Sequence, residues 1–251
     1  MILQEPDRTA YDVRFHLFGV EVRIHPFFWI FSLLMSPTGN PKLALIWIAA
    51  VILSLLVHEF GHVLAFRSYG IRSNIVLHAF GGLAIPEGSG YSGSFGPRFS
   101  NGASAVIAFA GPAAEILSAI AMLGVVRLTG HEVILIRGGL LGFEAIPNLV
   151  EFPNIMQFIY FYGIISFVWG VINLLPIIPL DGGKISQALF LRIDSHTGLK
   201  QALILSILTA IFIGLYLVVQ TGSLWNALLF AYLAYMNYQA LEQIGFGGRR
   251  W

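Results

Sequence analysis

Long apolar runs, separated by polar, glycine-rich or proline-rich segments, make up most of the chain. A membrane-spanning helix needs about 20 mostly apolar residues, and the runs that come near this length predict about six spans. They lie at about residues 26–36, 42–69, 103–126, 155–180, 199–219 and 224–239. The first run is short for a full crossing, so it could tilt or be re-entrant. The pattern predicts an all-α polytopic membrane protein with about six transmembrane helices.

Two shorter segments have patterns typical of strands. Residues 15–24 alternate loosely between apolar and polar positions, which predicts a short strand. Residues 75–85 are apolar but too short to span as a helix, and Gly81 and Gly82 disfavour helix there. We expect a strand or hairpin that dips towards the membrane as a small membrane-associated β segment. Residues 87–102 are rich in Gly, Ser and Pro, which predicts a mobile loop that could act as a gate.

Proline and glycine interrupt two further regions. Pro112 lies inside the 103–126 run and should kink that helix or mark a restart within it. Residues 128–154 mix short apolar pieces with glycine and proline, and we expect them to lie at the membrane interface. The chain shows no internal repeat and no segment that predicts a second, soluble domain.

Composition supports a membrane protein and narrows the possible chemistry. Hydrophobic residues make up 57% of the 251 positions and charged residues only 11%, whereas a soluble domain carries about 25% charged residues. The formal net charge of +1 argues against a nucleic-acid partner. The chain has no cysteine, so histidine and carboxylate side chains must hold any transition metal.

Basic residues predict which face of the membrane each loop occupies. With the N-terminus inside and six spans, eleven of the 14 Lys and Arg fall in inside segments, as the positive-inside rule expects. The C-terminal ends of the 42–69 and 155–180 spans then both face the cytoplasm. We therefore expect a multi-pass protein of the cell membrane, with functional residues near these two ends at one depth.

A pentapeptide near the end of the 42–69 helix carries the candidate chemistry. It reads HEFGH and contains His58, Glu59 and His62. Two histidines four apart face the same side of a helix, so both imidazoles can reach one metal ion. The adjacent Glu59 can serve as the base for a metal-bound water. The alternative is a membrane helix whose polar residues have no function. Three ionisable groups within five residues of an apolar helix are costly, however, unless they have a function.

A third metal ligand must come from elsewhere, because a hydrolytic zinc site usually takes three protein ligands and one water. Asp181 is the best candidate, since it ends an apolar span, follows two prolines and precedes two glycines that allow close backbone approach. Alternatively, Asp181 caps the next helix. Glu115 is the rival ligand, although its place three residues after Pro112 also suits the first turn of a restarted helix. His78 is more simply explained as a polar residue at the interface than as a ligand.

Four motifs occur in order along the chain, over about residues 22–188. They are HEFGH on one span, the Gly81-Gly82 segment, Ala110-Gly111-Pro112 on the next span, and NLLPIIPLDGG beginning at Asn173. Together they resemble the site-2 protease family of intramembrane zinc metalloproteases. The resemblance implies a three-helix catalytic core that binds one zinc ion per chain through His58, His62 and Asp181. It also implies that Glu59 is the catalytic base and that Asn173 helps to stabilise the transition state.

This resemblance implies an intramembrane metalloendopeptidase that hydrolyses peptide bonds in or near transmembrane segments, by a zinc-activated water with the motif glutamate as general base. We expect one membrane-embedded peptidase domain over residues 1–251, with a catalytic core at about 43–190 and additional helices at about 199–240. No PDZ insert or C-terminal regulatory domain is recognisable. The site would open to the cytoplasmic side.

The expected partners are a transmembrane protein substrate and the lipid bilayer, and the oligomeric state stays open. The strand containing Gly81 and Gly82 would bind the extended substrate by adding it as a further strand. The alternative for this strand is a plug between helices.

Two other functions fit parts of the same pattern. A transporter or channel could use Glu115 and Asp181 as an ion path, and its ion flux would not depend on Glu59. A proteolytically inactive homologue could bind and retain membrane clients. The intact Glu59 argues against that alternative, because a binding module has no need of the base.

Overall fold

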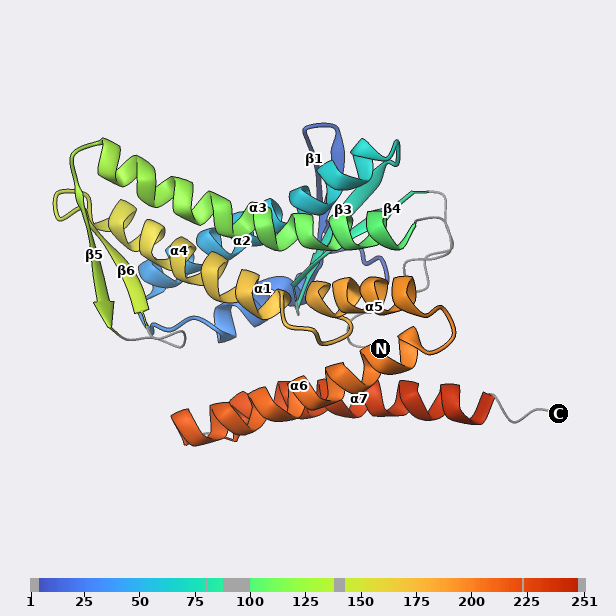
Figure 1. Cartoon of the computed structure of the whole chain (residues 1–251). Helices are drawn as coiled ribbons and strands as arrows, with labels where there is room; N and C mark the ends of the chain where they lie inside the picture. Colours follow the sequence, from blue (N-terminus) through green and yellow to red (C-terminus); the bar gives the residue numbers. More distant parts are fainter. Residues whose placement is uncertain (1–4, 80, 88–99, 138–142, 223, 248–251) are drawn as a thin grey trace. The chain divides into compact units, whose positions relative to one another are not determined.

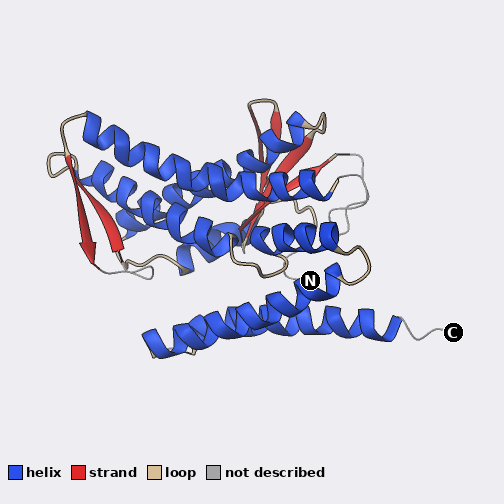
Figure 2. Cartoon of the chain, in the orientation of Figure 1, coloured by secondary structure: helices blue, strands red, loops and turns tan. Residues whose placement is uncertain are grey.

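A computed structural model of the chain describes residues 5–79, 81–87, 100–137, 143–222 and 224–247. Helices make up most of these residues, and the strands gather in two places (Figure 2). The helices are α1 (Pro26–Leu34), α2 (Pro41–Ser68), α3 (Asn101–Leu128), α4 (Pro153–Asn173), α5 (Asp181–Ile193), α6 (Gly198–Thr221) and α7 (Trp225–Gly247). The strands are β1 (Val13–Leu17), β2 (Val20–Ile24), β3 (Ser73–His78), β4 (Gly81–Pro86), β5 (Glu132–Arg137) and β6 (Phe143–Asn148). Most of the predicted 87–102 loop, with its proposed gating role, lies outside the described residues.

The chain divides into two compact units. The first holds residues 1–94 and 110–171, and the second holds residues 95–109 and 172–251. The strands β1–β6, helices α1 and α2, and most of α3 and α4 therefore belong to the first unit. Helices α5, α6 and α7 belong to the second (Figure 1).

Four of the described helices are long and apolar enough to cross a membrane. They are α2, α3, α4 and, from Gly198 to Gln220, α6. Helix α1 has nine residues, which gives a length of about 14 Å against a hydrocarbon core of about 30 Å. Helix α7 carries Asn237, Gln239 and Glu242 in its second half, which shortens its apolar stretch. The structure therefore supports a mostly helical membrane protein with small sheets, but it does not confirm the predicted six spans.

The N-terminal segment forms a hairpin rather than the single predicted strand. Phe18 and Gly19 make its turn with positive φ values of 50° and 74°, and they divide the 15–24 segment between β1 and β2. Strand β2 pairs in parallel with β3, and β3 pairs antiparallel with β4, so the sheet order is β1-β2-β3-β4. The β3–β4 pair confirms the hairpin predicted at 75–85 and leaves β4 at an edge of the sheet.

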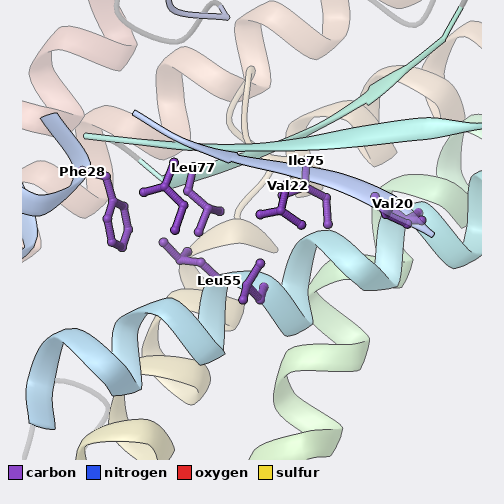
Figure 3. Close-up of a cluster of buried hydrophobic side chains, with 9 residues drawn as sticks. Val20, Val22, Phe28, Leu55, Ile75 and Leu77 are labelled. Carbon is purple, nitrogen blue, oxygen red and sulfur yellow. The ribbon is translucent and has the colours of Figure 1, made fainter. Parts of the chain in front are cut away.

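A buried hydrophobic cluster joins this sheet and α1 to α2. Figure 3 shows Val20, Val22 and Phe28 following one another along α2. Arg67, near the end of α2, donates a 3.0 Å hydrogen bond to the carbonyl oxygen of Phe18, so β2 begins beside that end and runs back along the helix. Five residues of strand and nine of helix together extend about 30 Å. Strand β2 contains Glu21 and Arg23, so this length is not an apolar span.

Helices α2, α3 and α4 run side by side in the first unit (Figure 1). Gly61 on α2 lies so close to α3 that an added Cβ would come within 2.9 Å of the Cβ of Ala114. Helix α4 is joined to α3 by a 2.5 Å hydrogen bond between the hydroxyls of Tyr162 and Ser118. Pro112 lies inside α3, which continues as one helix on both sides of it, so the predicted restart does not occur.

A second, two-stranded sheet connects α3 to α4. Strands β5 and β6 pair antiparallel, with Glu132 opposite Asn148 and Arg137 opposite Phe143. The sequence predicted only a mixed interfacial segment here. Each strand has six residues, and β6 contains Pro147, which weakens the strand pattern because proline cannot donate to a ladder.

In the second unit, Asp181 is the first residue of α5 rather than the residue that caps it. The N-cap position is Leu180, and no side chain caps this helix end. Added Cβ atoms at Gly182 and Gly183 would overlap the backbone of the preceding turn at Leu174 and Ile177. The glycines therefore let the start of α5 pack against the turn that leads into it, and the capping alternative for Asp181 is wrong.

Two side chains from α6 and α7 hold the same turn through Ile178. The backbone N–H of Ile178 donates a 3.1 Å hydrogen bond to the hydroxyl of Ser206 on α6. The side-chain amide of Asn237 on α7 donates a 2.6 Å hydrogen bond to the carbonyl oxygen of Ile178. Ser206 and Asn237 are both buried. The last two helices thus satisfy the backbone of the turn that precedes Asp181.

Candidate metal centre

Helix α2 brings His58, Glu59 and His62 together in the first unit. All three residues are buried, with exposed fractions of 3%, 3% and 7%. Their possible ligand atoms lie within 4.8 Å of one another, and the Nε2 atoms of the two histidines are 3.2 Å apart. The helical i, i+4 spacing therefore places both imidazoles on one side of α2, as predicted.

This histidine pair fits a tetrahedral zinc ion. Two nitrogens that each lie about 2.0–2.1 Å from one zinc ion, at a tetrahedral angle, are about 3.3 Å apart. The observed separation of 3.2 Å agrees with that value. Imidazole and carboxylate donors, in a chain without cysteine, are also a donor set that zinc accepts.

Glycines on two neighbouring elements make room for the motif. An added Cβ at Gly111 on α3 would overlap the His62 ring and lie 2.8 Å from Nε2 of His58. An added Cβ at Gly82 on β4 would lie 2.5 Å from Oε1 of Glu59. A side chain at Gly111 would thus fill the space between the two imidazoles, and one at Gly82 would displace the carboxylate. Both positions need glycine because of these close approaches.

Glu115 contacts His58 and does not lie in the first turn of a helix. It is fully buried in α3, and its Oε2 lies 2.8 Å from Nδ1 of His58. Its Oε1 accepts a 2.6 Å hydrogen bond from Ser54, whose hydroxyl in turn accepts one from Ser166. The sequence predicted either a rival metal ligand or a first-turn carboxylate. The first-turn interpretation is wrong, because α3 does not restart at Pro112.

Sequence reasoning missed Ser54 and Ser166. The only signal for them is that small hydroxyl side chains in apolar helices often join neighbouring helices. That signal names no partner, and Ser54 and Ser166 are 112 residues apart. His78, the other histidine considered, is buried at the end of β3 and is outside the metal-ligand cluster that the described residues form.

Asn173 and Asp181 belong to the second unit. Asn173 is the last residue of α4 and is 9% exposed, and Asp181 is 3% exposed. The ammonium group of Lys184 donates a 2.9 Å hydrogen bond to Oδ1 of Asp181. The roles of Asn173 as a transition-state donor and of Asp181 as a metal ligand stay predictions, as does substrate binding by Gly81 and Gly82.

The sequence pattern around this centre matches a known family. The family model described as Peptidase family M50 matches residues 46–217, which include the HEFGH motif and extend into α6. This match covers more than half of the chain. The chain belongs to peptidase family M50. The M50 assignment agrees with the resemblance carried by the four sequence motifs.

Two similar proteins from Methanocaldococcus jannaschii support this assignment. The M50 chain is 24% identical over 184 residues to the protein named Zinc metalloprotease MJ0392, a match that covers 71% of the chain and 45% of that relative. The chain thus matches less than half of the relative's length. The solved structure of Site-2 Protease from the same organism aligns with a TM-score of 0.55 and 21% identity, and the alignment covers 92% of this chain and 95% of that one. The structural match supports the mostly helical fold with small sheets described above.

Proposed function

We propose that this M50 chain is an intramembrane zinc metalloprotease that hydrolyses peptide bonds in or near transmembrane segments of membrane proteins. The observation that carries the proposal is the buried His58–His62 pair, with Glu59 beside it, inside a helix apolar enough to span the membrane. Three buried ionisable groups at this position are costly unless they bind a metal and do chemistry.

Three residues of α2 have separate proposed roles in metal binding and proton transfer. His58 and His62 would hold the zinc ion through Nε2, because Nδ1 of His58 is occupied by Glu115. When bound, zinc lowers the pKa of a water ligand towards neutrality and polarises the scissile carbonyl. Glu59 would accept the proton of the attacking water on its carboxylate and later donate it to the leaving amine.

Two further residues would complete the proposed site. Asp181 would be the third zinc ligand, and its support is that it is buried and does not cap α5. Asn173 would donate a hydrogen bond to the developing oxyanion, as preorganised amides do in acyl-transfer enzymes. We propose accordingly that residues 1–251 act as one membrane-embedded peptidase domain, with the site open to the cytoplasm.

Strand β4 offers a place for an extended substrate. It is the last strand of the sheet β1-β2-β3-β4, so one of its edges is not paired within that sheet. A peptide added at an edge strand gains backbone hydrogen bonds. Gly82 lies against Glu59, so a strand bound here would pass close to the proposed base. Gly81 and Gly82 are therefore the proposed substrate-binding positions.

The ion-path alternative has lost part of its support. It required Glu115 to face a path for ions. Both carboxylate oxygens of Glu115 instead contact side chains of α2, namely His58 and Ser54.

Two variants test the proposed function. Glu59→Gln should retain zinc but lose at least about 10²-fold in cleavage rate, because it removes the general base without removing a ligand. Asp181→Ala should lose zinc, because it removes a ligand. The measurements are metal content of the purified protein and cleavage of a transmembrane model substrate in proteoliposomes.

Full cleavage by Glu59→Gln would contradict the role of the base. Unchanged metal content in Asp181→Ala would contradict the third ligand. Ion flux in liposomes that persists in Glu59→Gln would favour a transporter, and capture of a client without any cut product by the wild-type protein would favour a binding protein.

A further inference from the structure

We propose that Glu115 is a positioning residue that orients His58 for zinc. This inference rests on the proposed function. Glu115 would bind Nδ1 of the imidazole and so present Nε2, the opposite ring nitrogen, to the metal.

The geometry of the histidine pair supports this role. Oε2 of Glu115 lies 2.8 Å from Nδ1 of His58, and Nε2 of the same ring lies 3.2 Å from Nε2 of His62. In its ionised form the Glu115 carboxylate only accepts hydrogen bonds, and His58 would then donate to it from Nδ1. A neutral imidazole with its proton on Nδ1 carries its lone pair on Nε2. The proposed contact would therefore favour the tautomer that can bind zinc through the nitrogen facing His62.

Glu115 is itself held in place by several groups. Ser54 on α2 donates to its Oε1 at 2.6 Å, and Ser166 on α4 donates to the Ser54 hydroxyl at 2.9 Å. On the other side, an added Cβ at Gly170 on α4 would lie 3.5 Å from Oε2. A serine pair from α2 and α4 thus holds the carboxylate that contacts His58.

A purely structural role for Glu115 would be to join α3 to α2. The pair Ser118–Tyr162, one turn further along α3, shows that neutral hydroxyls suffice to join helices in this unit. A carboxylate costs more to bury than a hydroxyl, and that cost is offset where it accepts two hydrogen bonds and supports a metal-bound imidazole. The location of the carboxylate on Nδ1 of a proposed ligand therefore favours the positioning role.

The test compares zinc affinity in the full chain, purified in detergent. The variants are Glu115→Leu, which removes the acceptor but keeps much of the volume, and Glu115→Gln, which can still accept from Nδ1 through its amide oxygen. Ser118→Ala is the matched control, because it cuts a hydrogen bond between α3 and α4 without touching His58. Zinc affinity is measured by competition with a chromogenic chelator, and the absorption spectrum of the cobalt-substituted protein reports the ligand geometry.

We expect Glu115→Leu to lose about 10–100-fold in zinc affinity, as is usual when the partner of a metal-binding histidine is removed. Glu115→Gln should lie between Glu115→Leu and wild type in affinity and should alter the cobalt spectrum. Ser118→Ala should keep both the wild-type affinity and spectrum.

Wild-type affinity in Glu115→Leu would overturn the positioning role. If that variant does not fold, wild-type affinity together with a wild-type cobalt spectrum in Glu115→Gln would overturn it equally. A wild-type chain that binds no zinc would instead contradict the proposed function.

Discussion

Three glycines leave the space that the metal centre and its helices need. Gly61, Gly82 and Gly111 come from α2, β4 and α3, and each lies where a Cβ would strike a neighbouring group. Gly111 opens the space between the imidazoles, Gly82 leaves room for Glu59, and Gly61 lets two helix backbones approach. The glycines in these motifs therefore have a steric reason that the sequence alone does not supply.

Gly61→Ala should destabilise the protein by separating α2 from α3. The new methyl group would overlap the Ala110 carbonyl and lie 2.9 Å from the Cβ of Ala114, and such overpacking typically costs about 1–3 kcal/mol. The measurement is the free energy of unfolding in detergent. Gly124→Ala on α3 is the control, because nothing lies within 4 Å of its added Cβ. Equal effects of the two substitutions would contradict the close-approach explanation.

Asp12 links the N-terminal segment to β2 and should make stability depend on pH. Burial would raise the pKa of Asp12, but hydrogen bonds from the Thr9 side chain and backbone and from Arg23 outweigh it and lower the pKa to about 2. The ordinary value is 3.8. Because the folded-state pKa is the lower one, the stabilisation is present above pH 3.8 and is lost as the pH falls from 3.8 towards 2.

Asp12→Asn should therefore be less stable than wild type near neutral pH and should lose less stability on acidification through this window. Thermal unfolding in detergent at a series of pH values measures both effects. Thr9→Val, which removes one of the hydrogen bonds to Asp12, should give an intermediate pH dependence. Parallel curves for wild type and Asp12→Asn would rule out this linkage.

The residues that could be predicted are those whose relation is set by spacing along one helix. His58 and His62 face the same side of α2 because they are four positions apart. The contact of Glu115 with His58 joins positions 57 residues apart, and it depends on how α3 packs against α2. A hydropathy pattern identifies both helices but does not give the rotation of one about the other.

Among the elements, those with a continuous apolar run were predicted and those with mixed composition were not. Helix α2 and the β3–β4 hairpin match the predicted ranges closely. Strands β5 and β6 were missed because glycine and proline interrupt short apolar pieces. Helix α5 was missed as a separate element because it has only 13 residues and its apolar positions do not form a continuous run.

Helices α6 and α7 are expected to stabilise the turn before Asp181. Asn237→Leu would leave the partly buried Ile178 carbonyl without the amide donor that α7 supplies, and loss of such a hydrogen bond costs about 0.5–1.5 kcal/mol. The variant should unfold more easily and should be cut sooner by added protease within residues 174–180. Tyr238→Phe, at the next and exposed position, is the control. Equal protection of that segment in Asn237→Leu and wild type would argue against this contact.

At the scale of the whole molecule, the number of crossings could not be read from hydropathy alone. The first apolar run forms the nine-residue helix α1, which is too short to span as a helix. The second half of α7 is polar at several positions, so its apolar stretch falls short of a full span.

The absence of cysteine makes the membrane orientation directly testable. Single cysteines can replace Lys42, Arg72, Arg127 and Arg192, which are exposed side chains near the ends of helices or beside them. In the proposed orientation, an impermeant maleimide added outside intact cells should label positions 42 and 127, while positions 72 and 192 should react only after lysis. Labelling of 72 and 192 in intact cells would reverse the orientation, and labelling of all four would reject it.

Two residues of α3, Gly111 and Glu115, lie against the two histidines of α2. During synthesis, α2 enters the membrane well before α3, and 57 residues separate His58 from Glu115. Until α3 arrives, the His58 ring lacks its 2.8 Å contact with the Glu115 carboxylate. The histidine pair would thus gain its positioning carboxylate only when α3 inserts, and a nascent chain that has inserted only α2 should hold metal weakly. Zinc that binds after α3 has docked would then stabilise the assembled helix pair, so that metal loading would report correct insertion.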